Sequence, residues 1–294
     1  MNLSAPLLLG LLVALGSAAL YSSGAALQAL EARNTPDREA LHASLLRDLA
    51  SRPRWLLGTG AVLVGWSLQA GALLLAPVTV VQPTLAAGLV ILLAVGTRVL
   101  GESVGRREVL AVLAIFVGVA GLAASAPLPS TERADPQVLA IAMAGLALVA
   151  LTPYLLRSSG RPLGGLVIAS GGLAYAVCGL STSFAGDALP NAQWLVILFW
   201  LGVTVAAALI GLVSEMTAFQ HGAVTHVFPV MLVIQMLVAV LLMPVLGVES
   251  WGATPLNGVA LAASIAVVAG GAAALVGTPA VGAALATSRG TDRE

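Results

Sequence analysis

The sequence predicts an all-helical, polytopic membrane protein of about nine transmembrane helices in two inverted repeats. Three observations lead to this prediction. The chain of 294 residues is 59% hydrophobic and only 9% charged, whereas a soluble domain carries about 25% charged residues. Its apolar residues fall into stretches of the length, about 20 residues, that crosses a bilayer as a helix. Two segments 146 positions apart also share one motif.

The apolar stretches give the predicted spans. We expect them near 5–28, 55–76, 78–99, 108–126, 137–155, 163–185, 194–215, 222–245 and 256–277. The first stretch is longer than the apolar core of a secretory signal and lacks a basic segment before it, so we expect it to be a retained span.

Arginine supplies the expected orientation. One of the thirteen basic residues, Arg133, falls in a loop on one side of the predicted membrane, and the other twelve fall on the opposite side. Because cytoplasmic loops carry the excess of basic residues, we expect the C-terminus in the cytoplasm, the N-terminus outside, and the chain in a cytoplasmic (inner) membrane.

A repeated motif predicts the arrangement of the two halves. Val78-Thr79 and Pro83 recur as Val224-Thr225 and Pro229 without a gap, and the triplet Val99-Leu100-Gly101 recurs as Val245-Leu246-Gly247. A Glu follows each triplet, at Glu102 and, one residue later, at Glu249. The step between matched spans is five, an odd number, so the second copy enters the membrane upside down. We therefore divide the chain into halves at 1–134 and 135–294, the second with a short C-terminal tail.

The longest predicted loop, 31–54, has an amphipathic pattern. Thr35-Pro36-Asp37 is typical of a helix start, with a capping hydroxyl and an early proline. Leu41, Leu45, Leu46 and Leu49 would then share one helix face. This pattern favours an interfacial helix on the inner leaflet, with a gating or docking role as the alternative.

Polar residues deep in the predicted spans are the first candidates for a solute site, since they are costly in lipid. Glu215 is the one carboxylate well inside an apolar stretch, and the offset of 146 places Gln69 at its mirror position. We expect both to line one central cavity, together with Trp66. The alternative is that Gln69 only bonds a neighbouring helix.

The repeated prolines are the second group of candidates. Pro83 and Pro229 each remove a backbone donor, and Thr79 and Thr225 lie one turn earlier, where their hydroxyls could bond the freed backbone. These four residues complete the predicted substrate-binding set; a plain helix kink is the alternative. His221 and His226 lie close to Glu215, but their spacing is poor for two metal ligands on one helix face, so we predict no metal site.

Several of these segments carry a resemblance to a known family. The residues are Gly65-Trp66-Ser67-Leu68-Gln69, Ala76-Pro77 before the Val-Thr motif, Leu100-Gly101-Glu102, and Ala126-Pro127. Over roughly 55–127, and loosely over 194–275, the chain resembles the drug/metabolite transporter superfamily, and within it the NIPA-type magnesium transporters. The resemblance implies nine spans, an outside N-terminus and solute transport.

Two positions depart from the NIPA-type pattern. Trp66 stands where that family carries Glu, and Gln69 stands where it carries Asn. Mg²⁺ prefers oxygen ligands that include carboxylates. A cavity that is neutral and partly aromatic suits an organic solute better, of the kind that the EamA-like branch of the superfamily carries.

These patterns together predict a secondary transporter that moves a small solute by alternating access. A NIPA-like permease for divalent cations is the alternative, and a non-transporting membrane scaffold is the alternative of another class. We expect no enzyme activity, no cofactor and no nucleic-acid partner. The expected partners are a small molecule or ion as substrate and the lipid bilayer, and a homodimer is compatible with these predictions.

The predicted topology can be tested with reporter fusions. Fusions placed after Arg161 and after Arg293 should both report a cytoplasmic position, because both follow an odd number of spans from an outside N-terminus. Opposite results at the two sites would show that the count of spans between them is wrong.

Overall fold

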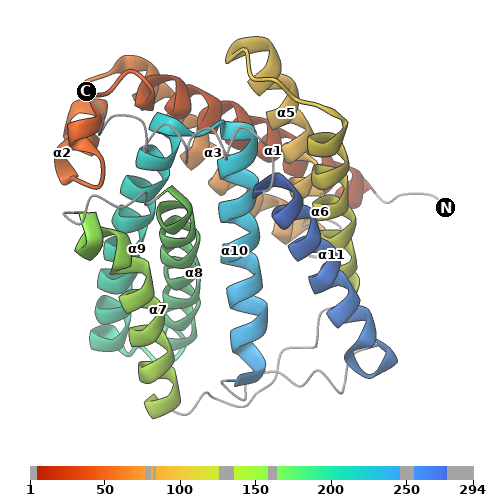
Figure 1. Ribbon diagram of the computed structural model, residues 1–294. Coiled ribbons are helices and arrows are strands. Elements are labelled where there is room, and N and C mark those ends of the chain that lie inside the picture. Colours follow the sequence, from red (N-terminus) through yellow and green to blue (C-terminus); the bar gives the residue numbers. More distant parts are fainter. Residues whose placement is uncertain are drawn as a thin grey trace.

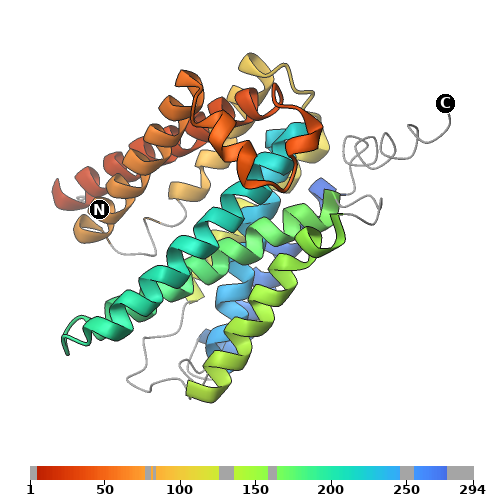
Figure 2. The ribbon, with the colours of Figure 1, turned by 90° about the vertical axis from the view of Figure 1, so that its left-hand side faces the viewer.

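The computed structural model is a bundle of helices (Figure 1). It describes residues 5–76, 81, 84–125, 136–157, 164–245 and 255–276. In that part of the chain all regular structure is helical. Figure 2 shows the bundle from its side. The helices α1 and α3 lie together at the upper left, and α7, α8 and α9 lie below them.

Short helices and turns connect the long ones. Between α1 and α3 the chain forms a 3₁₀ turn at Asp37–Glu39 and a short helix, α2. A second 3₁₀ turn, Pro255–Gly258, leads into α11. In chain order the helices are α1 (Ala5–Ala32), α2 (Ala43–Leu49), α3 (Pro53–Leu75), α5 (Gly88–Val99), α6 (Arg106–Ser125), α7 (Pro136–Leu156), α8 (Gly164–Ala188), α9 (Trp194–His221), α10 (Val224–Val245) and α11 (Val259–Val276).

Eight of the described helices are long and apolar enough to cross a membrane. They are α1, α3 and α6 to α11, and they confirm a polytopic helical membrane protein. The remaining predicted span, 78–99, coincides with a shorter apolar helix at Thr84–Val99. Residues 77–80 and 82–83, which include Thr79 and Pro83, lie outside the described residues. One boundary differs clearly, since α9 continues to His221 where a loop was expected after 215.

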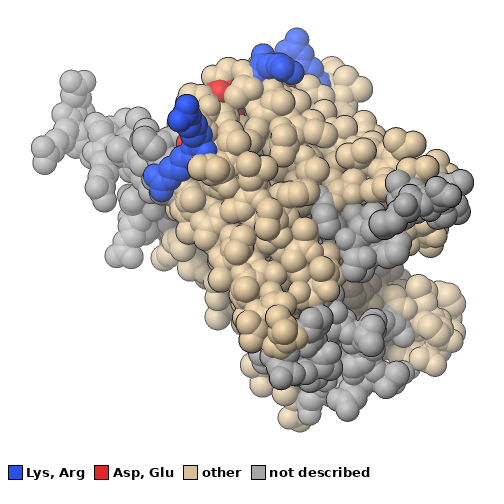
Figure 3. All heavy atoms as spheres, turned by 90° about the vertical axis from the view of Figure 1, so that its right-hand side faces the viewer, with Lys and Arg blue, Asp and Glu red and all other residues tan. Residues whose placement is uncertain are grey.

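The surface has the character that a lipid solvent requires. Large apolar side chains on the outer helices point away from the protein, among them Leu74 at 88% exposure and Leu195 at 85%. Arginine side chains gather at one end of the face in Figure 3, and the rest of that face carries little charge. We call this the arginine-rich end; it contains the turn and helix between α1 and α3 and the start of α6.

Glycines let several helices approach closely. A Cβ on Gly24 of α1 would lie 2.6 Å from the carbonyl oxygen of Gly58 in α3. In the same way, a Cβ on Gly271 of α11 would lie 2.7 Å from the carbonyl oxygen of Ala111 in α6. Small residues at helix contacts are the usual device for packing in membranes, where lipid tails compete equally for apolar side chains.

The helix packing follows a pattern that relates the two halves. In the first half, α1 packs along α3 and also contacts α5. In the second half, α8 packs along α9 and also contacts α10. The next helices, α6 and α11, pack against each other, and α5 contacts α10. The contacts of α1 with α3 and α5 therefore have counterparts in the contacts of α8 with α9 and α10.

The loop at 31–54 differs from its prediction. Leu45 and Leu49 of α2 are completely buried, and α2 packs against α9. These leucines cannot rest on the lipid, so the interfacial-helix interpretation is wrong for this face. The predicted start at Thr35-Pro36-Asp37 gives only the 3₁₀ turn, with no side-chain cap, and the Thr35 hydroxyl donates to the carbonyl of Ala32.

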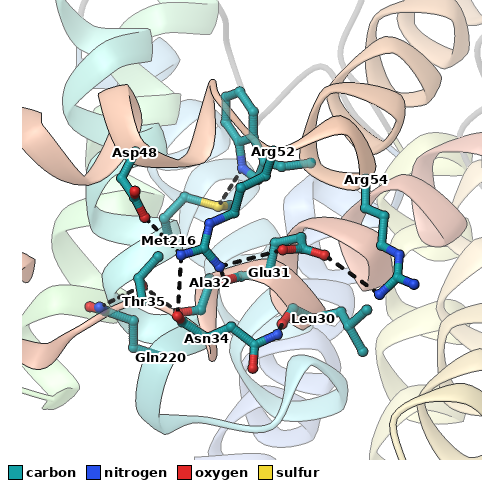
Figure 4. Close-up of polar contacts among 11 residues, drawn as sticks. Leu30, Glu31, Ala32, Asn34, Thr35, Asp48, Arg52, Arg54, Met216 and Gln220 are labelled. Carbon is teal, nitrogen blue, oxygen red and sulfur yellow. Dashed lines mark hydrogen bonds and ion pairs between the residues drawn. The ribbon is translucent and has the colours of Figure 1, made fainter.

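Polar contacts fix this loop to the ends of α1 and α9 (Figure 4). Arg52 donates to the carboxylate of Asp48 at 2.8 Å and to Glu31 of α1 at 3.4 Å. Gln220 of α9 donates to the Thr35 hydroxyl at 2.9 Å. The indole nitrogen of Trp55 donates to the sulfur of Met216 at 3.2 Å. The loop is therefore an integral part of the arginine-rich end.

Two neighbouring glycines of α11 provide a test of the packing. Gly271→Ala places its Cβ against backbone of α6, so we expect it to lower the free energy of unfolding by about 1–3 kcal/mol. Gly270→Ala has no heavy atom within 4 Å of its new Cβ, so we expect a change within about 0.5 kcal/mol. Thermal unfolding of both variants in detergent measures the difference. Equal stability of the two would contradict the α6–α11 contact.

Candidate functional site

A cavity of about 680 Å³ lies among the helices of both halves. Its wall is mostly apolar and includes Phe228, Met231 and Met236. A small set of polar side chains faces the same space. This set comprises Tyr21, Ser22, Gln69, Tyr175, Ser183, Glu215 and Gln235. An apolar cavity of this size with a few polar groups is typical of a small-molecule site.

Glu215 of α9 is the carboxylate that lines this cavity among the described residues. Its side chain is held by the phenol of Tyr175 in α8, which donates to Oε2 at 2.5 Å. Gly211, one turn before Glu215, makes this possible, because a Cβ there would lie 2.8 Å from the ring of Tyr175. The ring of Tyr175 therefore lies close against α9 at Gly211, and its hydroxyl fixes the carboxylate of Glu215.

Trp66 and Gln69 enter the same cavity from α3. They belong to the first half, whereas Glu215 belongs to the second, so these three predicted residues do come together around one space. Trp66 remains 53% exposed. Tyr21 packs its ring against Phe228 of α10, with the ring centres 5.7 Å apart. Aromatic rings from both halves therefore border the polar groups.

Gln235 is a polar cavity residue that the sequence interpretation missed. It lies in the middle of α10, within an almost entirely apolar stretch. Its position in the sequence indicated this role, because a glutamine deep in an apolar span is as costly in lipid as Gln69 is. The offset of 146 pairs it with Leu89, which also lines the cavity.

Thr225 and Pro229 do not line this cavity. Both are buried in the first turns of α10, which continues through the proline. The sequence suggested that the Thr225 hydroxyl would bond the backbone freed by the proline. Instead, this hydroxyl donates to Oε2 of Glu102 at 2.6 Å. Of the predicted set, Thr79 and Pro83 lie outside the described residues.

Glu102 forms a second polar cluster, at the arginine-rich end. Its carboxylate accepts hydrogen bonds from the backbone N–H groups of Val224 at 2.8 Å and Thr225 at 3.0 Å, and it pairs with Arg33. These N–H groups begin α10 and have no partner within that helix, and an anion is favoured at such a helix start. Although burial acts to raise the pKa of Glu102, the hydrogen bonds from Thr225, Arg33 and Val224 outweigh it and hold the pKa below its usual value.

His226 follows this cluster and is also buried. Its Nε2 lies 3.7 Å from Oε1 of Glu108 in α6, and Glu108 in turn accepts a hydrogen bond from the N–H of Gly105. His221 lies 3.3 Å from Asp37 at the surface. Among the residues that the structure describes, no three side chains of His, Cys, Asp or Glu are grouped to hold a metal ion.

The Glu102 cluster makes stability depend on pH. Because the pKa of Glu102 is lowered in the folded protein, its contribution is present above the ordinary value of 4.5 and is lost as the pH falls through the folded value. We expect Glu102→Gln to lower the free energy of unfolding by about 2–3 kcal/mol near neutral pH. The difference in melting temperature between the two proteins should shrink below about pH 4.5. A difference that stays constant with pH would contradict this role of the carboxylate.

Comparison with known proteins gives one relative of unknown function. The chain is 26% identical to an uncharacterised protein of Corynebacterium glutamicum over 240 residues, which cover 79% of this chain and 82% of that protein. No protein-family model and no solved structure matches the chain.

Proposed function

We propose that this protein is a secondary transporter of the drug/metabolite transporter type, which moves a small organic solute across the cytoplasmic membrane by alternating access. The observation that carries the proposal is the cavity between the halves, with Gln69 from one half and the Tyr175-bound Glu215 from the other. A carboxylate inside a membrane protein is costly to keep and is usually functional.

The packing of the helices supports an inverted repeat. The pairs α1–α3 and α1–α5 correspond to α8–α9 and α8–α10, and α6 packs against its own counterpart α11. An in-plane two-fold axis would pass between α6 and α11 and between α5 and α10. Transporters with such repeats bind their solutes beside that axis and expose the site alternately to either side.

The lining of the cavity indicates the class of solute. Phe228, Met231 and Met236 offer apolar contact, and Gln69 and Gln235 offer neutral hydrogen-bonding groups. Among the described lining residues, Glu215 provides the negative charge when it is ionised. We infer a solute with an apolar body and a cationic or hydrogen-bonding head. A divalent cation would call for several oxygen ligands, usually including carboxylates.

The arginine-rich end gives the proposed orientation. It collects the described arginines of the segment between α1 and α3 and of the start of α6. From the positive-inside rule we infer that this end faces the cytoplasm.

Transport by purified protein in liposomes tests the proposal. Uptake of small organic amines, matched neutral analogues and Mg²⁺ is compared, with Glu215→Gln as the key variant. The substitution keeps the shape and removes the charge, so we expect transport of the amine to fall by at least about tenfold and to lose its pH dependence.

A matched control separates the cavity from the rest of the protein. Asp37→Asn also removes one carboxylate, but from a side chain that is 83% exposed at the arginine-rich end, and it should leave uptake unchanged. If Glu215→Gln transports amines at the native rate with native pH dependence, Glu215 is structural. Uptake of Mg²⁺ in place of amines would favour the divalent-cation alternative.

A further inference from the structure

Most of the cavity lining lies away from the arginine-rich end, and Glu215 of α9 and Phe228 of α10 are its lining residues nearest to that end. Helix α6 begins at that end with Arg106, yet its cavity residues are Val119, Leu122 and Ala123, close to its other end. Helix α8 contributes residues only from Tyr175 onward. On α10 the lining begins at Phe228, after the first turn.

The space between the cavity and the arginine-rich end is filled by side chains. Met216 and Phe219 of α9 and Val224 of α10 are completely buried there. Met216 follows Glu215 directly in sequence, so this apolar layer begins where the cavity stops. The cavity is therefore closed toward the arginine-rich end.

Glu102 holds this closed arrangement from outside the apolar layer. It belongs to the first half, between α5 and α6, and it binds the first two N–H groups and the Thr225 hydroxyl of α10 in the second half. Arg33, just after α1, pairs with the same carboxylate and reaches the carbonyl of Gly222 at 3.3 Å. Gly96 of α5 leaves room for this contact, because a Cβ there would lie 2.5 Å from the methyl group of Thr225.

We propose that Glu102 is a latch: its bonds to the start of α10 keep the cavity closed toward the arginine-rich end, and they break when the cavity opens to that side. The inference rests on the proposed alternating access, but it concerns the state of one end and not the identity of the solute.

The chemistry of the latch suits a reversible contact. When α10 moves away, its first N–H groups and the Glu102 carboxylate lose their bonds to each other. Water at the membrane surface can then hydrogen-bond to both. The side chain of Arg33 is already 29% exposed, whereas that of Glu102 is 5% exposed. Opening therefore hydrates a charged pair that lies at the boundary of the protein, and it does not bury an unpaired charge.

Cysteine accessibility from each side of the membrane tests the latch. The chain has one cysteine, Cys178, so Cys178→Ser provides a background without thiols. Ser183→Cys then places a small thiol in the cavity wall, at a residue that is exposed. A charged, impermeant methanethiosulfonate reagent is added to vesicles of either orientation. Exposed positions at opposite ends, Ser51→Cys and Asn191→Cys, verify the sidedness.

With the latch intact, we expect Ser183→Cys to react much more slowly from the arginine-rich end. Adding Glu102→Gln should raise that rate by at least about tenfold, since charge-assisted bonds are lost. Arg33→Gln should act in the same direction, and it provides the answer if Glu102→Gln does not fold. Asp48→Asn is the matched control, because it removes a carboxylate at the same end whose partner, Arg52, is four residues away in the same loop; it should change nothing.

Two outcomes would overturn the inference. Equal labelling from both ends with the latch intact would show that the cavity is not closed. Native labelling in both folded variants, Glu102→Gln and Arg33→Gln, would show that the contact is not a latch. Because the readout is accessibility, a protein that transports normally but shows this second result retains the proposed function and loses only the latch.

Discussion

The structure depends on one constraint: a polar group inside this protein must be satisfied by the protein or by water in a cavity, because lipid offers no partner. Ser17 and Ser22 of α1 meet it by donating to the carbonyls of Gly65 and Gly88, both at 2.7 Å. These bonds require helix backbones to approach closely, and the same glycines permit the approach. Packing by small residues and bonding by hydroxyls are therefore two parts of one solution.

The constraint also explains why the two ends of the bundle differ. At the arginine-rich end, loops, helix starts and charged side chains satisfy one another, as Glu102 does for the start of α10 and Glu31 does for Arg52. Farther from that end the helices separate around a cavity, and the polar groups there face space that a solute or water can enter. The bundle therefore combines one cross-linked end with an interior that holds a cavity.

The sequence predicted the helical class and the cavity residues of α3 and α9, because composition and polar residues in apolar spans report directly on a lipid solvent. It did not predict the role of Thr225, since the partner Glu102 is 123 residues away and the repeat marks Glu102 without showing what it binds. It also misplaced the leucine face of α2. An amphipathic face shows that something apolar covers it, and a helix such as α9 meets that need as well as lipid does.

The remaining step concerns the charge in the cavity. The ion pairs among the described residues lie at the arginine-rich end, and none of them reaches Glu215. They involve Arg33, Arg52, Arg54, His221 and His226. The phenol of Tyr175 donates one hydrogen bond to Glu215 but brings no positive charge. An ionised Glu215 therefore needs a cation from outside the described residues, and a protonated Glu215 needs none. In the proposed transporter these two conditions would alternate as a cationic solute or a proton enters and leaves, so that one carboxylate would couple occupancy of the cavity to its charge.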